Sequence, residues 1–251
     1  MVTPMKEEEY LFDKWHDCPV CYGTFKAKIV RAGKARMIRT DKDLKPVYED
    51  IDPIKYDVIL CPHCGYAALG KFFKDVKTYQ IRLIKEKISS SFTAPVMEGS
   101  TYTYEEALWR YKMCMVNNMV RNSKTSEKAY TCLKTGWLLR SMGEALDPEK
   151  EGYERRLTEI KTKEREYLKN ALDGFIAAMQ TEEYPICGMD EPTYEYLIAV
   201  LSMEFEQYDN ASRLISGIIT SRLANSRTKD KARDLKEELV KKMKQQKAGV
   251  S

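Results

Sequence analysis

Residues 18–21 read Cys18-Pro19-Val20-Cys21, and residues 61–64 read Cys61-Pro62-His63-Cys64. In each pair two residues separate the cysteines, a spacing at which a tight turn aims both thiolates at one ion. Four soft thiolates in a tetrahedral array suit zinc, so Cys18, Cys21, Cys61 and Cys64 are the predicted metal ligands. Iron in the same cage of four sulfurs, which would make the site an electron-transfer centre, is the alternative.

The role expected of this metal is structural. Four cysteines close the coordination sphere and leave no position for water, whereas a hydrolytic metal needs one. A bound zinc of this kind contributes roughly 10–16 kcal/mol, enough to hold together a module with little hydrophobic core. The two histidines, His16 and His63, lie beside the cysteine pairs. We expect neither to be a ligand, because the four thiolates already saturate the ion.

The sequence around the cysteines favours strands and turns. Residues 25–30 mix apolar and basic side chains as a strand does, and residues 35–40 are the expected return strand after a short turn. Residues 56–60 form another β-prone run, which leads into Cys61. Residues 1–15 are expected to be only a short lead-in.

From residue 67 onward the pattern becomes helical, with apolar residues at steps of three and four over residues 67–88. Thr103 and Glu106 form a capping box. The helix that follows would carry four residues inward: Leu108, Tyr111, Met115 and Met119. Further helices are predicted at about residues 126–142, 148–180, 192–206, 208–224 and 228–246. The predicted fold is therefore α+β and mostly α, with a β-rich module at residues 1–66 and antiparallel helices at residues 67–251.

Composition excludes several classes of protein. The chain has 251 residues, 43% of them hydrophobic and 32% charged, which is the balance of a soluble globular protein. No apolar run approaches the roughly 18–20 residues of a membrane helix, and no secretory signal is expected at the N-terminus. Seven cysteines, an odd number, argue for a reducing compartment and against a framework of disulfides.

The cysteine turns and the residues between them resemble a bacterial family catalogued as domain of unknown function 2225. The resemblance is carried by Cys18-Pro-Val-Cys21, Phe25, Val30-Arg31, Gly33-Lys34, Asp41-Lys-Asp43-Leu44, Tyr48, Pro53, Tyr56 and Cys61-Pro-His-Cys64-Gly65-Tyr66-Ala67. It implies a cytoplasmic bacterial protein with a zinc-ribbon-like N-terminal module at residues 1–66. It implies no reaction.

A second resemblance lies in the helices. Residues 196–211 look like the first helix, the turn and the start of the second helix of a tetratricopeptide repeat, with small residues at Ala199 and Ala211. Ile218 departs from the pattern, because the repeat prefers alanine there. The resemblance implies a tetratricopeptide-like domain at residues 67–251, of a class that binds peptides or proteins on a concave face.

Basic side chains cluster in the β-rich module. Six of them fall on the hairpin expected at residues 25–40: Lys26, Lys28, Arg31, Lys34, Arg36 and Arg39. Because zinc ribbons often bind nucleic acids, this hairpin makes a nucleic acid a possible partner. The net charge of the whole chain is only +4, which is weak for that class.

The sequence favours structural roles for the other candidate residues. Asp41 and Asp43 could bind a divalent cation or act as acid and base, but a solvated turn or the capping of backbone N–H groups is the favoured interpretation. Cys187 lies in a loop without a histidine near it in the sequence, and Cys114 and Cys132 are expected in the core. No phosphate-binding loop, dinucleotide-binding motif or nucleophile elbow occurs, so no catalytic residue is predicted.

These observations favour a non-enzymatic, cytoplasmic zinc-binding protein that binds a protein or peptide partner through its helical part and has no membrane contact. A nucleic-acid-binding accessory protein that uses the basic hairpin is the first alternative. An iron–thiolate redox protein is the second.

Overall fold

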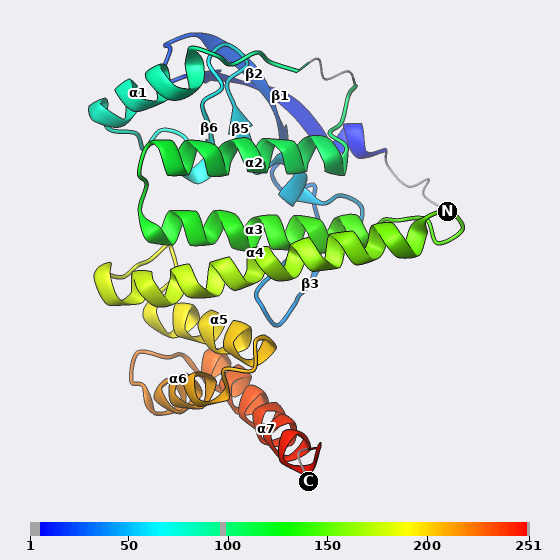
Figure 1. The fold of residues 1–251 in the computed structure, drawn as a ribbon, viewed down its shortest axis with the longest axis vertical. Coiled ribbons are helices and arrows are strands. Elements are labelled where there is room, and N and C mark those ends of the chain that lie inside the picture. The colour runs from blue at the N-terminus through cyan, green and yellow to red at the C-terminus, as the bar shows by residue number, and fades with distance from the viewer. Residues whose placement is uncertain (1–5, 96–98, 250–251) are drawn as a thin grey trace.

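The fold places short strands first and long helices after them (Figure 1). The computed structural model describes residues 6–95 and 99–249. The predicted class, α+β and mostly α, is confirmed. The strands in the described part of the chain are β1 (Leu11–Asp17), β2 (Thr24–Val30), β3 (Met37–Thr40), β4 (Pro46–Tyr48), β5 (Val58–Leu60) and β6 (Ala67–Leu69).

Consecutive strands pair, which gives three antiparallel two-stranded sheets. The longest joins β1 to β2 along all seven residues. The predicted hairpin between residues 25–30 and 35–40 is therefore wrong, because β2 pairs with β1 and β3 pairs with β4. The expected lead-in, residues 1–15, contains most of β1. Side chains on both faces of β1 are exposed, so its sequence lacks the alternation of a half-buried strand.

A short strand lies where the sequence predicted the start of a helix. Ala67–Leu69 is β6, and all three of its side chains are buried. A short apolar run fits a strand as well as a helix, so periodicity could not separate the two. The helix begins only at Thr78, where α1 (Thr78–Ile84) runs into a π-helical turn at Lys85–Ser89. The domain boundary after residue 66 stays a prediction, and the β5–β6 pair spans it.

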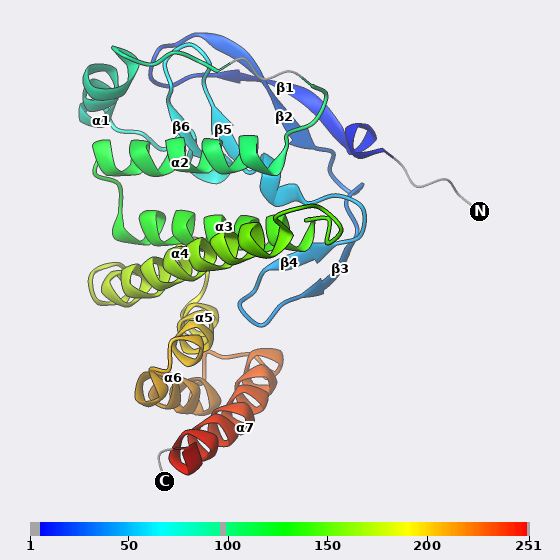
Figure 2. The same cartoon turned by 45° about the vertical axis from the view of Figure 1, so that its right-hand side comes forward.

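The first of three long helices packs on the β5–β6 pair, the other two lie beyond it in turn, and three more helices follow (Figures 1 and 2). Glycines let α3 and α4 approach closely: a Cβ on Gly136 would lie 2.7 Å from the Leu168 side chain, and one on Gly174 would lie 2.8 Å from that of Ala129. In the described part of the chain, no helix has the length and apolar character needed to cross a membrane. The helices after α1 are α2 (Tyr104–Val120), α3 (Thr125–Glu144), α4 (Tyr153–Thr181), α5 (Glu191–Glu204), α6 (Tyr208–Thr220) and α7 (Ser226–Gly249).

Local capping signals set several helix boundaries. Thr103 Oγ1 accepts from the Glu106 N–H at 3.1 Å, and the Glu106 carboxylate accepts from the Thr103 N–H at 2.7 Å, so the capping box is confirmed. The later helices lie within a few residues of their predicted ranges. The start of α4 differs most, because residues 147–152 form turns and Gly152 is left-handed, with φ 78°.

The buried face of α2 differs from the predicted one. Tyr111 is buried as expected, but Met119 is exposed, and Leu108 and Met115 are only partly buried. Two asparagines lie on the inner face, so hydrophobicity alone could not orient this helix. The buried residues of α2 are Ala107, Arg110, Tyr111, Cys114, Asn117 and Asn118.

The stretch that resembles a tetratricopeptide repeat forms α5, a short loop and α6, and the two helices pack against each other. Ala199 and Ala211 are completely buried, as the close approach of two helices requires. The helical hairpin is therefore confirmed, whereas its membership of a repeat array stays a prediction.

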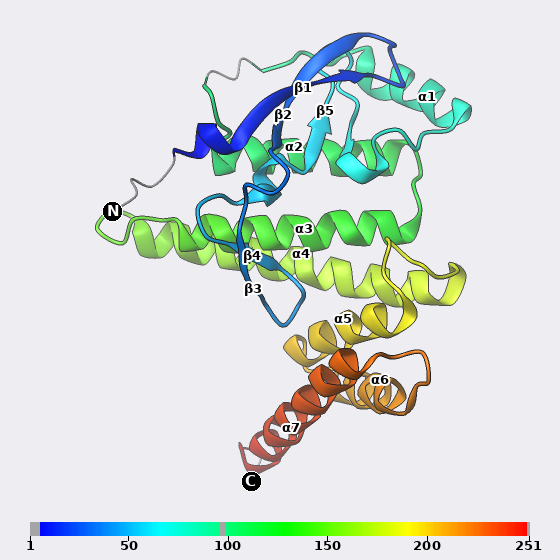
Figure 3. The same cartoon turned by 180° about the vertical axis from the view of Figure 1, so that it is seen from behind.

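The β3–β4 hairpin fastens the strands to the helices and crosses α3 and α4 on the side seen in Figure 3. Asp43, between β3 and β4, is buried. Its Oδ2 accepts hydrogen bonds from Trp137 Nε1 at 2.9 Å and from Arg140 Nη2 at 2.8 Å. Arg140 also donates to Glu164 of α4 at 2.7 Å. One buried carboxylate thus joins the hairpin to α3, and Arg140 extends the contact to α4.

Replacing Asp43 by alanine should lower the free energy of unfolding by about 3 kcal/mol, because it leaves Arg140 and the Trp137 N–H without their buried partner. The control Asp13→Ala removes a half-exposed carboxylate 3.6 Å from Lys28 and should cost less than about 1 kcal/mol. Urea unfolding followed by circular dichroism measures both changes. Equal losses for the two variants would contradict the role assigned to Asp43.

Candidate metal centre

Two turns of the same shape carry the four cysteines, one between β1 and β2 and the other between β5 and β6. In each, the N–H of the first cysteine donates to the carbonyl five residues later, and its carbonyl accepts from the N–H four residues later. The shared pattern explains why both pairs present their sulfurs to the same side of a turn. The bonds are Cys18 N to Gly23 O (3.0 Å), Tyr22 N to Cys18 O (2.9 Å), Cys61 N to Tyr66 O (2.8 Å) and Gly65 N to Cys61 O (3.1 Å).

Both turns place their fifth residue in the left-handed conformation, Tyr22 with φ 63° and Gly65 with φ 71°. Glycine adopts this conformation freely, whereas an L side chain costs roughly 1–2 kcal/mol. At Gly65 space is also missing, because a Cβ would lie 2.5 Å from the Phe92 ring. The Tyr22 side chain points into solvent, so that turn tolerates a side chain at the cost of backbone strain.

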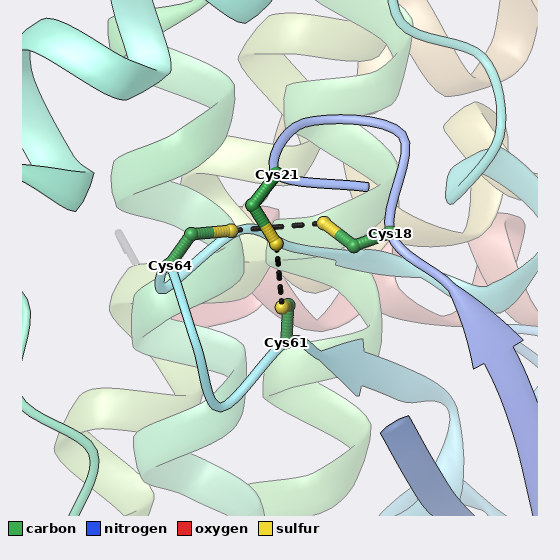
Figure 4. A group of neighbouring side chains, drawn as sticks. All are labelled: Cys18, Cys21, Cys61 and Cys64. Atoms are coloured by element: carbon green, nitrogen blue, oxygen red, sulfur yellow. Dashed lines mark hydrogen bonds between the residues drawn. The ribbon is translucent and has the colours of Figure 1, made fainter. Parts of the chain in front are cut away.

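The two turns bring four sulfurs to one point (Figure 4). The Sγ atoms of Cys18 and Cys64 are 3.6 Å apart, as are those of Cys21 and Cys61, and all four lie within 4.8 Å of one another. Tetrahedral coordination with Zn–S bonds near 2.3 Å requires sulfurs about 3.8 Å apart. All seven cysteines are free thiols. The four predicted residues therefore form a cluster that could hold a metal ion, and the donor set does not by itself identify the metal.

The four thiols share protons unequally when no cation is among them. The Cys18 sulfur accepts hydrogen bonds from the Cys61 and Cys64 thiols, which lowers the pKa of Cys18 to about 2. The same contacts with Cys18 raise the pKa of Cys61 to about 12 and raise that of Cys64 as well. Several thiolates side by side in a buried place need a positive ion, and a divalent metal keeps coordinating thiols deprotonated.

Apolar side chains surround the cluster and leave only Cys21 partly exposed. Two hydrogen bonds tie the second turn to helical segments: Ser89 Oγ donates to the Cys64 carbonyl, and Asn117 Nδ2 donates to the Gly65 carbonyl, each at 2.9 Å. Such outer contacts orient metal ligands, and the sequence offered no signal for them. The buried neighbours of the cysteines are Val20, Phe25, Ala27, Ile59, Tyr66, Ala68, Phe73, Ile84 and Ile88.

Neither histidine joins the sulfurs, and in residues 6–95 and 99–249 the four cysteines form the only group of three or more metal-binding side chains. The His63 ring packs against Gly23, and its Nε2 lies 3.3 Å from the Thr24 carbonyl oxygen. His16 stacks on Phe25, with ring centroids 5.8 Å apart, and burial lowers its pKa. Both histidines therefore contact the walls of the site.

Asp41 and Asp43, the candidate cation or acid–base site, both lie beside a cation of the protein, at 3.7 and 2.8 Å from Arg140. A third carboxylate of the same module, that of Asp57, forms an ion pair with Lys134. Asp43 is buried, so the expectation of a solvated turn is wrong for this residue, whereas the capping of a backbone N–H is confirmed, because Asp43 Oδ1 accepts from the Lys45 N–H at 3.3 Å. Its carboxylate faces a guanidinium and an indole N–H that lie far along the sequence, which no local pattern could indicate.

The three remaining cysteines lie apart from the cluster. Cys114 and Cys132 are buried in helices, as predicted. Cys187 Sγ donates to the Ser126 carbonyl at 3.3 Å, and burial raises the pKa of this thiol to about 11. A raised pKa is the opposite of what an activated cysteine needs.

The six basic residues assigned to one hairpin are dispersed, so that prediction is wrong. Lys26 and Lys28 are on β2, Arg39 is on β3, and these two strands do not pair. Arg36 and Arg39 each form an ion pair with a nearby carboxylate, at 3.1 and 3.2 Å. β2 pairs instead with the strand before it, across the cysteine turn at residues 18–23.

We expect one metal ion per purified chain. Cys61→Ser should retain much less than one, because it replaces a thiolate in the cluster by a hydroxyl. Cys187→Ser, the matched control, should retain one ion. Elemental analysis after gel filtration in a buffer with a weak chelator measures the content, and equal retention in the two variants would exclude Cys61 as a ligand.

The two left-handed positions should respond in opposite ways. Gly65→Ala should cost at least about 1 kcal/mol of stability and hasten metal release to a chelator, because the backbone is strained and Phe92 must move. Tyr22→Gly relieves strain at the equivalent position and should be neutral or stabilising. Thermal unfolding and chelator-release rates test the pair. Destabilisation by Tyr22→Gly as large as that by Gly65→Ala would refute the equivalence of the turns.

Residues 11–239 match a protein family described as uncharacterized protein conserved in bacteria (DUF2225). No curated protein and no solved structure matches the chain. The matched residues contain both cysteine turns, the β3–β4 hairpin and most of α7. Because the match covers most of the chain and agrees with the resemblance of the cysteine turns, this protein belongs to the bacterial family DUF2225.

Proposed function

We propose that this protein is a non-enzymatic, cytoplasmic zinc-binding interaction protein. In this proposal the four cysteines hold a structural Zn²⁺, and the helical part binds an amphipathic helix of a partner protein. The observation that supports the binding of a partner helix is an apolar groove beside α2. Free thiols at all seven cysteines support a reducing compartment.

The closed donor set supports a structural role for the ion. Four thiolates fill a tetrahedral shell, so no ligand position is left for a water or a substrate. Zinc prefers such a site and is colourless, whereas iron held by four thiolates absorbs visible light. A colourless protein that contains zinc is therefore the expected form.

The groove lies between α2, α3 and α4. A pocket of about 320 Å³ there is lined by Leu108 of α2, Leu139 of α3 and Tyr167 of α4. Lys112 and Lys163 belong to the same lining. An apolar floor with charged residues around it suits one face of a partner helix.

The side of α2 that lines this pocket extends beyond it as a stripe. Leu108, Lys112, Met115 and Met119 follow one another at steps of three and four residues, so they share one side of the helix. Met119 is 64% exposed and the neighbouring Val116 46%. Methionine adapts its shape to different partners, and the stripe is about 16 Å long, or three turns of a bound helix.

The charges around the groove indicate the character of the partner. The lining contains two lysines, Lys112 and Lys163, and one carboxylate, that of Glu166. A helix with acidic residues beside its apolar face would complement this surface. The proposed partner segment is therefore amphipathic and acidic, with apolar residues at steps of three and four.

A phage-displayed library of random peptides, panned on the purified protein, tests the proposal. Selected peptides should show helical apolar spacing and an excess of Asp and Glu. Val116→Glu should weaken their binding at least about tenfold, because it places a charge in the apolar contact and repels acidic peptides.

Val240→Glu is the matched control, since Val240 is 43% exposed on α7 and lies outside the lining of the groove. It should leave the affinities unchanged. Peptides without helical spacing, or equal losses for the two variants, would refute binding in the groove.

A further inference from the structure

One end of the molecule gathers most of its excess positive charge. Residues 11–34 and 71–87 together contain eleven Lys and Arg against four Asp and Glu, a formal charge of +7, although the whole chain carries only +4. The first segment contains the β1–β2 pair and the second contains α1. Four zinc-bound thiolates and the ion would reduce the charge of this end to about +5.

The two segments form one surface, although they are far apart in the sequence. Figures 1 and 3 show α1 beside the turn between β1 and β2. Phe25 of β2 packs with Phe73 and Ile84 in the apolar cluster around the cysteines. Lys85, which follows α1, lies over the Tyr22 ring at 5.3 Å. Because the two segments are separated in the sequence, their combined positive charge becomes apparent only in the folded structure.

Exposed aromatic rings lie among these charges. Trp15 is 63% exposed, Tyr22 72% and Phe12 38%. Each ring has a cation over it: Lys26 Nζ is 4.9 Å from the Trp15 ring, and the Arg31 guanidinium is 5.5 Å from the Phe12 ring. Trp15 and Lys26 are directly opposite each other on β1 and β2, so they share one face of the pair.

The two acidic residues of the β1–β2 pair are engaged by neighbours. Asp13 lies 3.6 Å from Lys28, and Asp17 accepts a hydrogen bond from Thr24 Oγ1 at 3.2 Å. Two exposed basic side chains, Lys26 and Arg31, lie over rings of this surface, whereas Lys14 lies on the opposite face of the pair from Trp15.

We propose that this basic end binds single-stranded nucleic acid. Trp15 and Tyr22 stack on bases, while Lys26 and Lys85, which lie beside these rings, contact phosphates. Exposed aromatic rings beside cations suit unpaired bases, because every base offers a π-face and the backbone needs positive charge. Bases in a duplex are already stacked and cannot cover the rings. The surface is distinct from the groove beside α2, so the two proposals stand or fall separately.

Fluorescence anisotropy with labelled oligo(U) and oligo(dT) of about 20 nucleotides tests the proposal at salt concentrations from about 50 to 200 mM. Binding of either strand should exceed binding of a duplex of equal length, and the ratio of the two affinities identifies the preferred sugar. Affinity should fall steeply as the salt concentration rises.

Trp15→Ala should weaken binding about 5- to 100-fold, the effect of losing one stacked base. Lys26→Gln should reduce the slope of log affinity against log salt by about 0.7, the value for one phosphate contact on a single strand. In the wild type, stacking on a base should quench the fluorescence of Trp15. Trp15→Phe should keep most of the affinity and should not show this quenching.

The matched controls lie on the far part of the molecule. Leu223→Ala removes an apolar side chain that is 71% exposed, and Lys241→Gln removes an exposed charge of α7. Both should bind like the wild type. The proposal is overturned if neither strand binds at low salt, if the duplex binds as well, or if Trp15→Ala behaves like Leu223→Ala.

Discussion

Four cysteine sulfur atoms that meet at one point, three of them from buried residues, are the constraint on which the N-terminal part of this structure depends. They come from two turns separated by 39 residues, and each turn closes its own short pair of strands. A two-stranded hairpin is marginally stable in water, because it buries little apolar surface. An ion bound by all four sulfurs would join the two pairs into one unit, and its binding free energy would become folding free energy.

Buried polar contacts then fix the strands of the N-terminal part on the helices at two separate places. Beside the cysteines, Asn117 of α2 donates to the Gly65 carbonyl. At the β3–β4 hairpin, Asp43 accepts from Trp137 and Arg140 of α3. Hydrogen bonds between buried groups specify position more sharply than apolar contacts do. The groove beside α2 and the basic end are therefore carried on one frame, and neither surface uses the buried contacts that hold the frame together.

The parts of this molecule that depend on neighbouring residues were predictable from the sequence, and the parts that depend on distant ones were not. Two-residue spacing indicated the cysteine cluster, and the Thr103–Glu106 pair indicated the start of α2. The partner of β2 was missed, since exposed side chains on both faces of β1 conceal a strand. The buried face of α2 was predictable only in part: Tyr111 lies inside as expected, but Met119 is exposed, because the inner face is completed by the polar residues Asn117 and Asn118.

X-ray absorption spectroscopy on freshly purified protein tests the central claim most directly, because it identifies the metal and counts its ligands at once. The account predicts zinc with four sulfur neighbours at about 2.3 Å and no nitrogen or oxygen in the first shell. A shell that contains nitrogen or oxygen would contradict the closed site. Iron in place of zinc would turn the cluster into an electron-transfer centre and contradict a purely structural role.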